Sequence, residues 1–378
     1  MKAIKALIIA ITVGTLPVTA ESPRKEDRPV VQIAILLDNS GSMSGLIQQA
    51  KQQLWQIVNE FISAKQDGKP PVVQVALYEY GIRDAQDNGS YVRQLSPLTD
   101  DLDKLSEKLF AISQRDSGGS EYCGWVIKDA VSDLKWDKSS KTYKAIFIAG
   151  NEPFTQGSVS WESACKDAIT KGVIVNTIHC GNEAAGIAGK WKDAAALSDG
   201  KFLNINHNAA VVAITAPQDK EIAELNGKLN HTYIAFGARG ADGKARQEAQ
   251  DSNAASAPAA PSVVAQRALS KASANYSNAT WDLVDRSKEK DFDLGKLKDE
   301  ELPEEMRKMS ADERKAHLTK KTAERADIQK QIADLAKKRD AYVAEALKSE
   351  GKDSTLGRAV TTAVREQAEK KGVSFEKR

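Results

Sequence analysis

The sequence predicts an α/β fold with a mostly parallel sheet covered by helices on both faces, followed by a mainly helical C-terminal region. In residues 29–230, continuous apolar runs of strand length alternate with segments of helical periodicity, as right-handed βαβ crossovers require. The first apolar run ends in the polar turn DNSGS, at the edge where such sheets bind ligands. Charged residues become denser after residue 250, which is typical of long solvated helices.

The elements follow one another in a regular order. Apolar, β-branched residues over 30–37 predict a strand buried on both faces, and apolar residues at helical spacing predict a helix over 46–61. Further strands are expected at 72–80, 144–149, 173–179 and 201–205, and further helices at 102–110, 122–134, 160–170, 191–197 and 216–229. Together these elements form one expected domain, residues 29–230.

The rest of the chain divides into two expected parts. Residues 231–262 are expected to be an extension and a linker, because 252–261 are small and interrupted by proline. A fragment ending near residue 250 should therefore fold alone. Residues 263–378 form the expected charged helical region, whose longest helix, 311–347, carries a narrow heptad-like apolar stripe. That stripe favours packing on neighbouring helices over a coiled coil with another chain.

The N-terminus resembles a secretory signal. Lys2 and Lys5 precede an apolar run over 6–13, and small residues end the segment, so residues 1–20 predict a signal peptide cleaved after Ala20. The apolar run is much shorter than the ~20 residues that span a bilayer, and no later segment is long and apolar enough. The sequence therefore predicts an exported mature chain, periplasmic or secreted, without a membrane span.

The charge balance excludes one class of partner. The chain has 54 Lys and Arg residues against 52 Asp and Glu, a formal net charge of +2 over 378 residues. Such a balance gives no electrostatic basis for binding nucleic acid, and we expect no such partner.

The turn after the first strand carries the chemistry. Asp38, Ser40 and Ser42 are spaced two residues apart, so that one carboxylate and two hydroxyls can point to the same side of a tight turn. Hard oxygen donors of this kind suit Mg²⁺. The pattern is weak alone and gains weight from its place between a buried strand and an amphipathic helix.

At this turn the chain resembles a known family. The segment VVQIAILLDNSGSMSGLIQQAKQQL is similar to the opening of a von Willebrand factor type A (VWA) domain with its metal-ion-dependent adhesion site (MIDAS). Four later segments, SGGSEYCGWVIKDAV, KAIFIAGNEPF, GVIVNTIHCGN and WKDAAALSDGKFLNI, resemble other loops and strands of the family. The resemblance implies a doubly wound sheet, a bound Mg²⁺ (or Mn²⁺ or Ca²⁺), and a protein partner that offers an acidic side chain to the cation. It also implies that Ser120 stands where the second loop of the family normally has a threonine ligand.

The third loop departs from the family pattern. The family usually has Thr-Asp-Gly after its fourth strand, whereas this chain has Ala149-Gly150-Asn151-Glu152. Asn151 or Glu152 is expected to supply an oxygen instead, and Glu121 beside Ser120 is another nearby carboxylate. The metal ligands suggested by the resemblance are therefore Asp38, Ser40, Ser42, Ser120, Asn151 and Glu152. Glu79, in an otherwise apolar strand, is expected at the strand end, facing the loops or solvent.

The cysteines predict one disulfide. A crossover helix runs antiparallel to its strands, which brings the start of the helix at 160–170 and the end of the strand at 173–179 to one edge of the sheet. Cys165 and Cys180 are there, close enough to pair, and Cys123 is the rival partner. The alternative is three buried free thiols.

Three functions are compatible with these patterns. The first is an exported binding module, not an enzyme, that recruits a protein partner through the cation. The second is a structural envelope protein with a degenerate, metal-free VWA domain. The third is a metal-dependent hydrolase, against which stand the absence of a G-x-S-x-G elbow and of a Gly-rich phosphate loop with lysine, and the lack of a histidine near the DNSGS turn in sequence.

Overall fold

The computed structural model describes residues 28–83, 89–113, 118–208, 214–258, 260–350 and 356–376, without the side chains of 347–350. The expected signal peptide, residues 1–20, lies outside the described residues. Within the described ranges, none of the helices combines the length and apolar character needed to cross a membrane.

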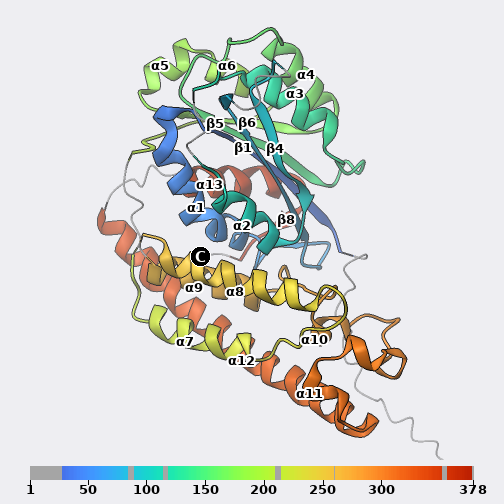
Figure 1. The fold of residues 1–378 in the computed structure, drawn as a ribbon. Helices are drawn as coiled ribbons and strands as arrows, with labels where there is room; N and C mark the ends of the chain where they lie inside the picture. Colours follow the sequence, from blue (N-terminus) through green and yellow to red (C-terminus); the bar gives the residue numbers. More distant parts are fainter. Residues whose placement is uncertain are drawn as a thin grey trace, which may run out of the picture.

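A six-stranded sheet forms the centre of the fold (Figure 1). Its strand order is β4-β3-β1-β5-β6-β7, and every neighbouring pair is parallel except β3 with β4. The strands are β1 (Val30–Asp38), β3 (Val72–Tyr80), β4 (Val92–Thr99), β5 (Tyr143–Gly150), β6 (Ile174–Cys180) and β7 (Phe202–Ile205). The mostly parallel sheet and five of its strands were predicted from the apolar runs.

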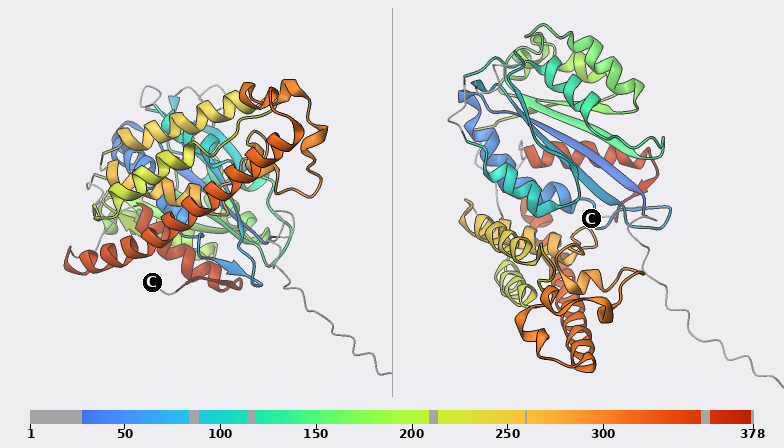
Figure 2. Two further views of the ribbon diagram at one scale, coloured as in Figure 1. Left: turned by 90° about the horizontal axis from the view of Figure 1, so that it is seen from below. Right: turned by 45° about the vertical axis from the view of Figure 1, so that its right-hand side comes forward.

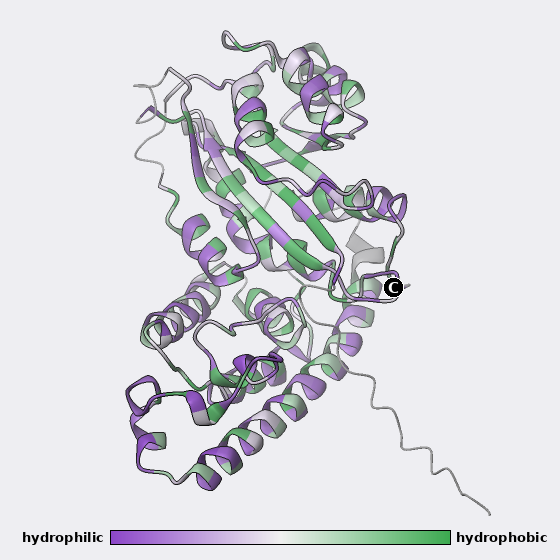
Figure 3. Cartoon of the chain, turned by 90° about the vertical axis from the view of Figure 1, so that its right-hand side faces the viewer, coloured by the Kyte–Doolittle hydropathy of each residue, from purple (hydrophilic) through white to green (hydrophobic). Residues whose placement is uncertain are grey.

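Helices cover both faces of the sheet, because its strands are apolar on both sides. Along β1, Val31, Ile33, Ile35 and Leu37 enter one core, whereas Ala34 and Leu36 enter the other. The first core is covered by α1 (Ser44–Asn59), α2 (Leu102–Phe110) and the C-terminal helix α13 (Leu356–Glu369). The second is covered by α3 (Cys123–Asp133), α4 (Trp161–Thr170) and α6 (Trp191–Leu197). Figure 3 shows the strands as the most hydrophobic part of the chain.

The strand β4 and the helix α5 of the sheet domain were not predicted. The edge strand β4 contains Pro97 and mixes exposed polar with buried and partly buried residues, a pattern that an edge strand tolerates, and the sequence analysis placed no element there. The short helix α5 (Glu183–Ala188) begins at Asn182, whose side chain accepts hydrogen bonds from the backbone N–H groups of Ala184 and Ala185.

The helical region lies against one side of the sheet domain (Figure 2). It consists of α7 (Asp219–Asn230), α8 (Gly240–Ser256), α9 (Ala260–Ala272), α10 (Leu283–Arg286), α11 (Glu304–Arg307) and the long α12 (Ala311–Glu350). The long helix packs on α7, α9 and α10 of the same chain, as its stripe of apolar residues favoured. A small core of its own includes Ile234, Leu283, Val284 and Met306.

The C-terminal helix α13 returns to the sheet. It packs on α1 and contacts β5, β6 and β7. Gln49 and Gln53 of α1 accept hydrogen bonds from the backbone N–H groups of Leu356 and Gly357 at 3.0 and 2.7 Å. The short strand β8 (Val373–Ser374) then pairs with β2 (Lys65–Gln66). The helical region is therefore an insertion between β7 and α13, not a tail that follows a finished domain.

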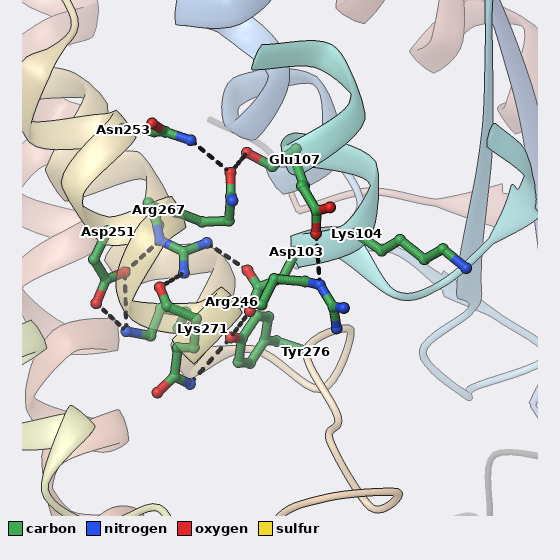
Figure 4. A network of polar contacts seen from close by, with 12 residues as sticks. Asp103, Lys104, Glu107, Arg246, Asp251, Asn253, Arg267, Lys271 and Tyr276 are labelled. Atoms are coloured by element: carbon green, nitrogen blue, oxygen red, sulfur yellow. Dashed lines mark hydrogen bonds and ion pairs between the residues drawn. The ribbon is translucent and has the colours of Figure 1, made fainter. Parts of the chain in front are cut away.

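A buried polar network joins the insertion to the sheet domain (Figure 4). Arg267 of α9 donates to Asp103 of α2 at 2.7 Å, and its guanidinium lies 4.8 Å from the Trp55 ring centroid of α1. Asp251 of α8 pairs with Arg267 and with Lys271. Each buried charge has an opposite charge beside it, which is the condition under which such groups are tolerated inside a protein.

These contacts differ from the division expected from the sequence. The helix at 219–230 packs on α9 and α12 of the insertion, whereas the sequence assigned it to the sheet domain. Residues 252–256, expected in a linker, continue α8, and α9 begins at Ala260. A fragment ending near residue 250 would lack α9 and α13, so the structure gives no reason to expect that it folds alone.

Candidate functional site

The polar residues singled out in the sequence meet at the C-terminal edge of the sheet. Asp38 ends β1, which lies between β3 and β5, and Gly150 ends β5. The chain leaves β1 towards α1 on one face, and it leaves β5 towards α4 on the other. In a doubly wound sheet, this divergence of neighbouring loops creates the crevice in which ligands bind.

The first loop gathers one carboxyl and two hydroxyls as expected. Asp38 is fully buried, and its Oδ1 accepts a hydrogen bond of 2.8 Å from the backbone N–H of Ser40. The Ser40 and Ser42 hydroxyl oxygens are 3.3 Å apart. Ser42 is exposed, whereas Met43 after it is buried and anchors the turn. Solvent exposure therefore increases along this loop, from the buried carboxyl of Asp38 to the exposed hydroxyl of Ser42.

The second loop adds a carboxyl that the sequence had noted only as nearby. Glu121 is buried, and its carboxyl lies within hydrogen-bonding reach of Asp38 and Ser40. Ser120 is half-buried directly before it. Gly81, with a φ of +73°, faces both acids: a Cβ there would be 3.0 Å from Asp38 Oδ1 and 3.2 Å from Glu121 Cγ. A side chain at position 81 would thus be strained and would crowd the acidic pair.

The third loop contributes an amide. Asn151 Nδ2 donates to Ser42 Oγ at 3.2 Å, so this residue joins the first loop. Glu152 is exposed, and its Oε2 accepts a hydrogen bond from Gln156 at 3.2 Å. Gly150 allows the close approach of the two loops, since a Cβ there would be 2.3 Å from Tyr80 Oη and 3.1 Å from Asp38 Oδ2.

The acidic pair is electrostatically strained. Burial, followed by the neighbouring carboxyl, raises the pKa of Glu121 to about 9, and burial also raises the pKa of Asp38. While both are ionised, neither can donate a hydrogen bond to the other. Asp38 Oδ2, Glu121 Oε2 and Asn151 Oδ1 are buried and have no hydrogen-bond partner among the described residues. A shared proton or a cation would satisfy them.

The oxygens fit a hard divalent cation. Two carboxyls, two serine hydroxyls and an amide oxygen are the donor types that Mg²⁺ and Ca²⁺ take. Among the residues that the structure describes, no three His, Cys, Asp or Glu side chains form a group able to hold a metal ion. A cation here would therefore depend on the hydroxyl and amide oxygens as much as on the two acids.

A buried ion pair supports the first loop from behind. Glu79 is 1% exposed; its Oε2 accepts from Asn39 Nδ2 at 2.8 Å and its Oε1 from Arg93 Nε at 2.6 Å. Arg93 comes from β4, the strand that the sequence did not reveal. Glu79 thus holds the residue between Asp38 and Ser40: it faces the first loop, as expected, and it is buried there and not exposed to solvent. An acidic residue inside an apolar strand was the signal for a buried partner.

His179 supports the third loop. Its Nε2 lies 3.2 Å from the Asn151 carbonyl oxygen and its Nδ1 lies 3.1 Å from Asn204 Nδ2. These partners fit a neutral ring that donates from Nε2 and accepts at Nδ1. Burial lowers the pKa of His179, which favours this neutral form.

The cysteines do not pair. Cys123, Cys165 and Cys180 are free and buried, so the expected Cys165–Cys180 disulfide is not formed. Cys165 belongs to the core under α3 and α4, whereas Cys180 enters the core on the opposite face of the sheet. The sequence argument brought both residues to the correct edge but did not consider the face to which each side chain points.

Comparisons with known proteins identify the domain. The family model of the von Willebrand factor type A domain matches residues 32–186. No curated protein matches the chain.

Several solved structures match part of this chain. The SpRpn10 VWA domain is 21% identical, with 47% of this chain and 88% of that chain covered and a TM-score of 0.35. BatB from Bacteroides thetaiotaomicron is 17% identical over 46% of this chain and 90% of its own, with a TM-score of 0.34. Proximal thread matrix protein 1 from the mussel byssus, with a zinc-occupied MIDAS motif, is 16% identical over 47% and 42%, with a TM-score of 0.36.

The matched residues run from β1 into α5 and contain all three loops of the candidate site. The mostly parallel sheet with helices on both faces agrees with that match. Residues 32–186 therefore form a von Willebrand factor type A domain, and the chain adds a helical insertion before its last helix.

Proposed function

We propose that this protein is a binding module that holds a divalent cation at the end of β1 and recruits a protein partner through it. The observation that carries the proposal is the set of three buried oxygens without partners, on Asp38, Glu121 and Asn151. Leaving a buried polar atom unpaired costs about 1–3 kcal/mol. A proton shared by Asp38 and Glu121 would satisfy two of the three atoms, whereas a cation would satisfy all three, which favours this function over an inert, metal-free envelope protein.

The ligands proposed from the first and third loops are Asp38, Ser40, Ser42 and Asn151, and Ser120 is proposed from the second. Mg²⁺ is the proposed ion, with Mn²⁺ or Ca²⁺ as substitutes. When bound, the ion supplies a positive charge and open coordination positions. The exposed side of the site, at Ser42 and Asn151, is where a partner can reach it. We propose that the partner offers an acidic side chain there.

A binding function is favoured over hydrolysis by the surroundings of the exposed hydroxyl, Ser42. A serine nucleophile requires a base within hydrogen-bonding reach, and among the described residues the hydrogen-bond partners of Ser42 Oγ are Ser40 Oγ and Asn151 Nδ2, neither of which is a base. The histidine beside the third loop, His179, has both ring nitrogens engaged by Asn151 and Asn204. We propose that the protein is not an enzyme, and that it acts outside the cytoplasm, as the signal-like residues 1–20 suggest.

Cation binding to the mature chain tests the proposal. We expect 5 mM Mg²⁺ or Mn²⁺ to raise the melting temperature and a chelator to reverse the effect, because a ligand that binds the folded state stabilises it, by about 2.7 kcal/mol at one hundred times its Kd. Asp38→Asn should remove the shift. Glu183→Gln is the matched control, because this exposed acid begins α5 near the same edge of the sheet.

Partner capture completes the test. The wild-type chain should retain a partner from the exported fraction in Mg²⁺ and release it in chelator, and Asp38→Asn should retain none in either condition. Equal capture by wild type and Asp38→Asn would show that the partner uses another surface. Absence of any cation effect on the wild-type chain would refute the cation site itself.

A further inference from the structure

The site is short of negative charge if its ligands come from the first and third loops alone. Asp38 is the one carboxyl of the first loop, and the third loop places an amide, Asn151, beside Ser42. Glu152 follows, but it is exposed and hydrogen-bonded to Gln156. The affinity of a site for a hard divalent cation depends on the number of charged ligands. The position of a second carboxylate therefore decides how well this site binds the cation.

Glu121 lies where a second carboxylate is needed. Its carboxyl lies within hydrogen-bonding reach of both Asp38 and Ser40, and its Oε2 is buried without a partner among the described residues. The backbone on both sides is fixed. The Glu121 N–H donates to Gln156 Oε1 at 3.3 Å, and its carbonyl accepts from the Cys123 N–H at 3.1 Å, at the start of α3. The side chain is therefore directed towards Asp38 by a held backbone.

We propose that Glu121 is a direct ligand of the cation and supplies the second carboxylate from the second loop, in place of an acid in the third. This inference rests on the proposed function, since it assumes that the site binds a cation. It assigns Glu152 to the exposed rim, outside the set of ligands.

The proposal changes how the site meets a partner. Asp38 and Glu121 are both buried, so the two charges that balance the cation lie on its inner side. Ser42 is exposed and Asn151 is half-buried, so the outer side presents neutral side chains. The two carboxylates balance the charge of a divalent ion, and the outer position is then open to one oxygen of the partner without a competing acid from the third loop.

Two matched substitutions test this assignment in the mature chain. Glu121→Gln keeps the size of the side chain and removes its charge, and we expect the Kd for Mn²⁺ in calorimetry to weaken at least tenfold. Glu152→Gln should bind Mn²⁺ with the Kd of the wild-type chain.

The outcomes separate the two proposals. If wild type binds Mn²⁺ and Glu121→Gln binds it equally well, the assignment of Glu121 is wrong while the cation site stands. If Glu152→Gln loses affinity, the third loop supplies the carboxylate and the assignment is also wrong. If wild type binds no cation, both proposals fail. Should Glu121→Gln fail to fold, Glu121→Asp replaces it, with the same tenfold loss expected because its carboxylate is one methylene further from Asp38.

Discussion

Removal of α13 should unfold the sheet domain, although the helix lies about 150 residues beyond β7 in sequence. Leu356, Val360 and Val364 of α13 are 1%, 0% and 1% exposed in the core under α1. Burial of a Val or Leu side chain is worth about 1.5–3 kcal/mol, so these three contribute roughly 5–9 kcal/mol. A typical domain has a free energy of unfolding of about 5–15 kcal/mol, so the loss of these three side chains is comparable to the total stability of the domain.

Polar contacts add to this loss. Gln367 accepts hydrogen bonds from Tyr143 Oη at 2.9 Å and from Asn176 Nδ2 at 3.0 Å, and donates to Asn176 Oδ1 at 2.6 Å. Without α13 these sheet atoms lose that partner, at about 1–3 kcal/mol for each buried group left unpaired. A chain that ends at residue 355 should therefore lack the cooperative urea transition of the full chain.

The assay is urea unfolding followed by circular dichroism, for the full mature chain and for the chain ending at 355. A peptide of residues 356–376 added to the truncated chain should restore part of the transition, because the contacts between α13 and the sheet domain are non-covalent and a separate peptide can form them. Val364→Ala in the full chain should cost about 2 kcal/mol, whereas Arg358→Ala, an exposed control on the same helix, should cost less than about 0.5 kcal/mol. A truncated chain with the wild-type midpoint would refute the reasoning.

Three further predictions follow from buried groups. Burial lowers the pKa of Lys271 from 10.5 to about 8. Between these two pH values the folded state binds fewer protons than the unfolded state, so the folded state gains stability as the pH rises. Urea unfolding should therefore show that the wild-type chain becomes more stable relative to Lys271→Met between pH 8 and pH 10. Below pH 8 Lys271 is protonated in both states, and the cost of burying its charge is fully present. A difference in stability between the wild-type chain and Lys271→Met that stays constant from pH 8 to pH 10 would contradict the lowered pKa. Glu79→Gln breaks the pair with Arg93 and should cost about 1–2 kcal/mol in urea unfolding, with a smaller loss of cation affinity than Asp38→Asn; a cost near zero would mean that the pair does not hold the loop. The mature chain, unfolded without reductant, should react with three equivalents of maleimide, and reaction of one equivalent would reveal a disulfide.

The sheet and its first loop could be predicted because their signals are local. Parallel strands buried on both faces are continuous apolar runs, and the polar turn after β1 stands out against them. The strand β4 lacks that signal, since it is an edge strand with Pro97 and partly exposed polar residues. Arg93, the partner of Glu79, lies on β4, so the support behind the first loop was hidden together with the strand.

The rest of the site depends on directions that a sequence does not encode locally. Ser120 and Glu121 are neighbours in the second loop, and the backbone conformation decides which of them turns towards Asp38. Cys165 and Cys180 share an edge of the sheet but enter opposite cores. The apolar face of α13 is visible in its spacing, but nothing in the sequence says that it covers a sheet formed far earlier in the chain.

The two ends of α1 connect the candidate site with the helical insertion. Its first turn follows Ser42, and near its last turn Asn59 Nδ2 donates to the Gln266 carbonyl of α9 at 2.7 Å. At the start of β1, Arg28 donates to Asn275 of the insertion at 2.9 Å, whereas Asp38 at the other end belongs to the site. Nine strand residues at about 3.3 Å each separate these ends by roughly 30 Å. The parts of the insertion that contact Asn59 and Arg28 therefore lie about one strand length away from the candidate site.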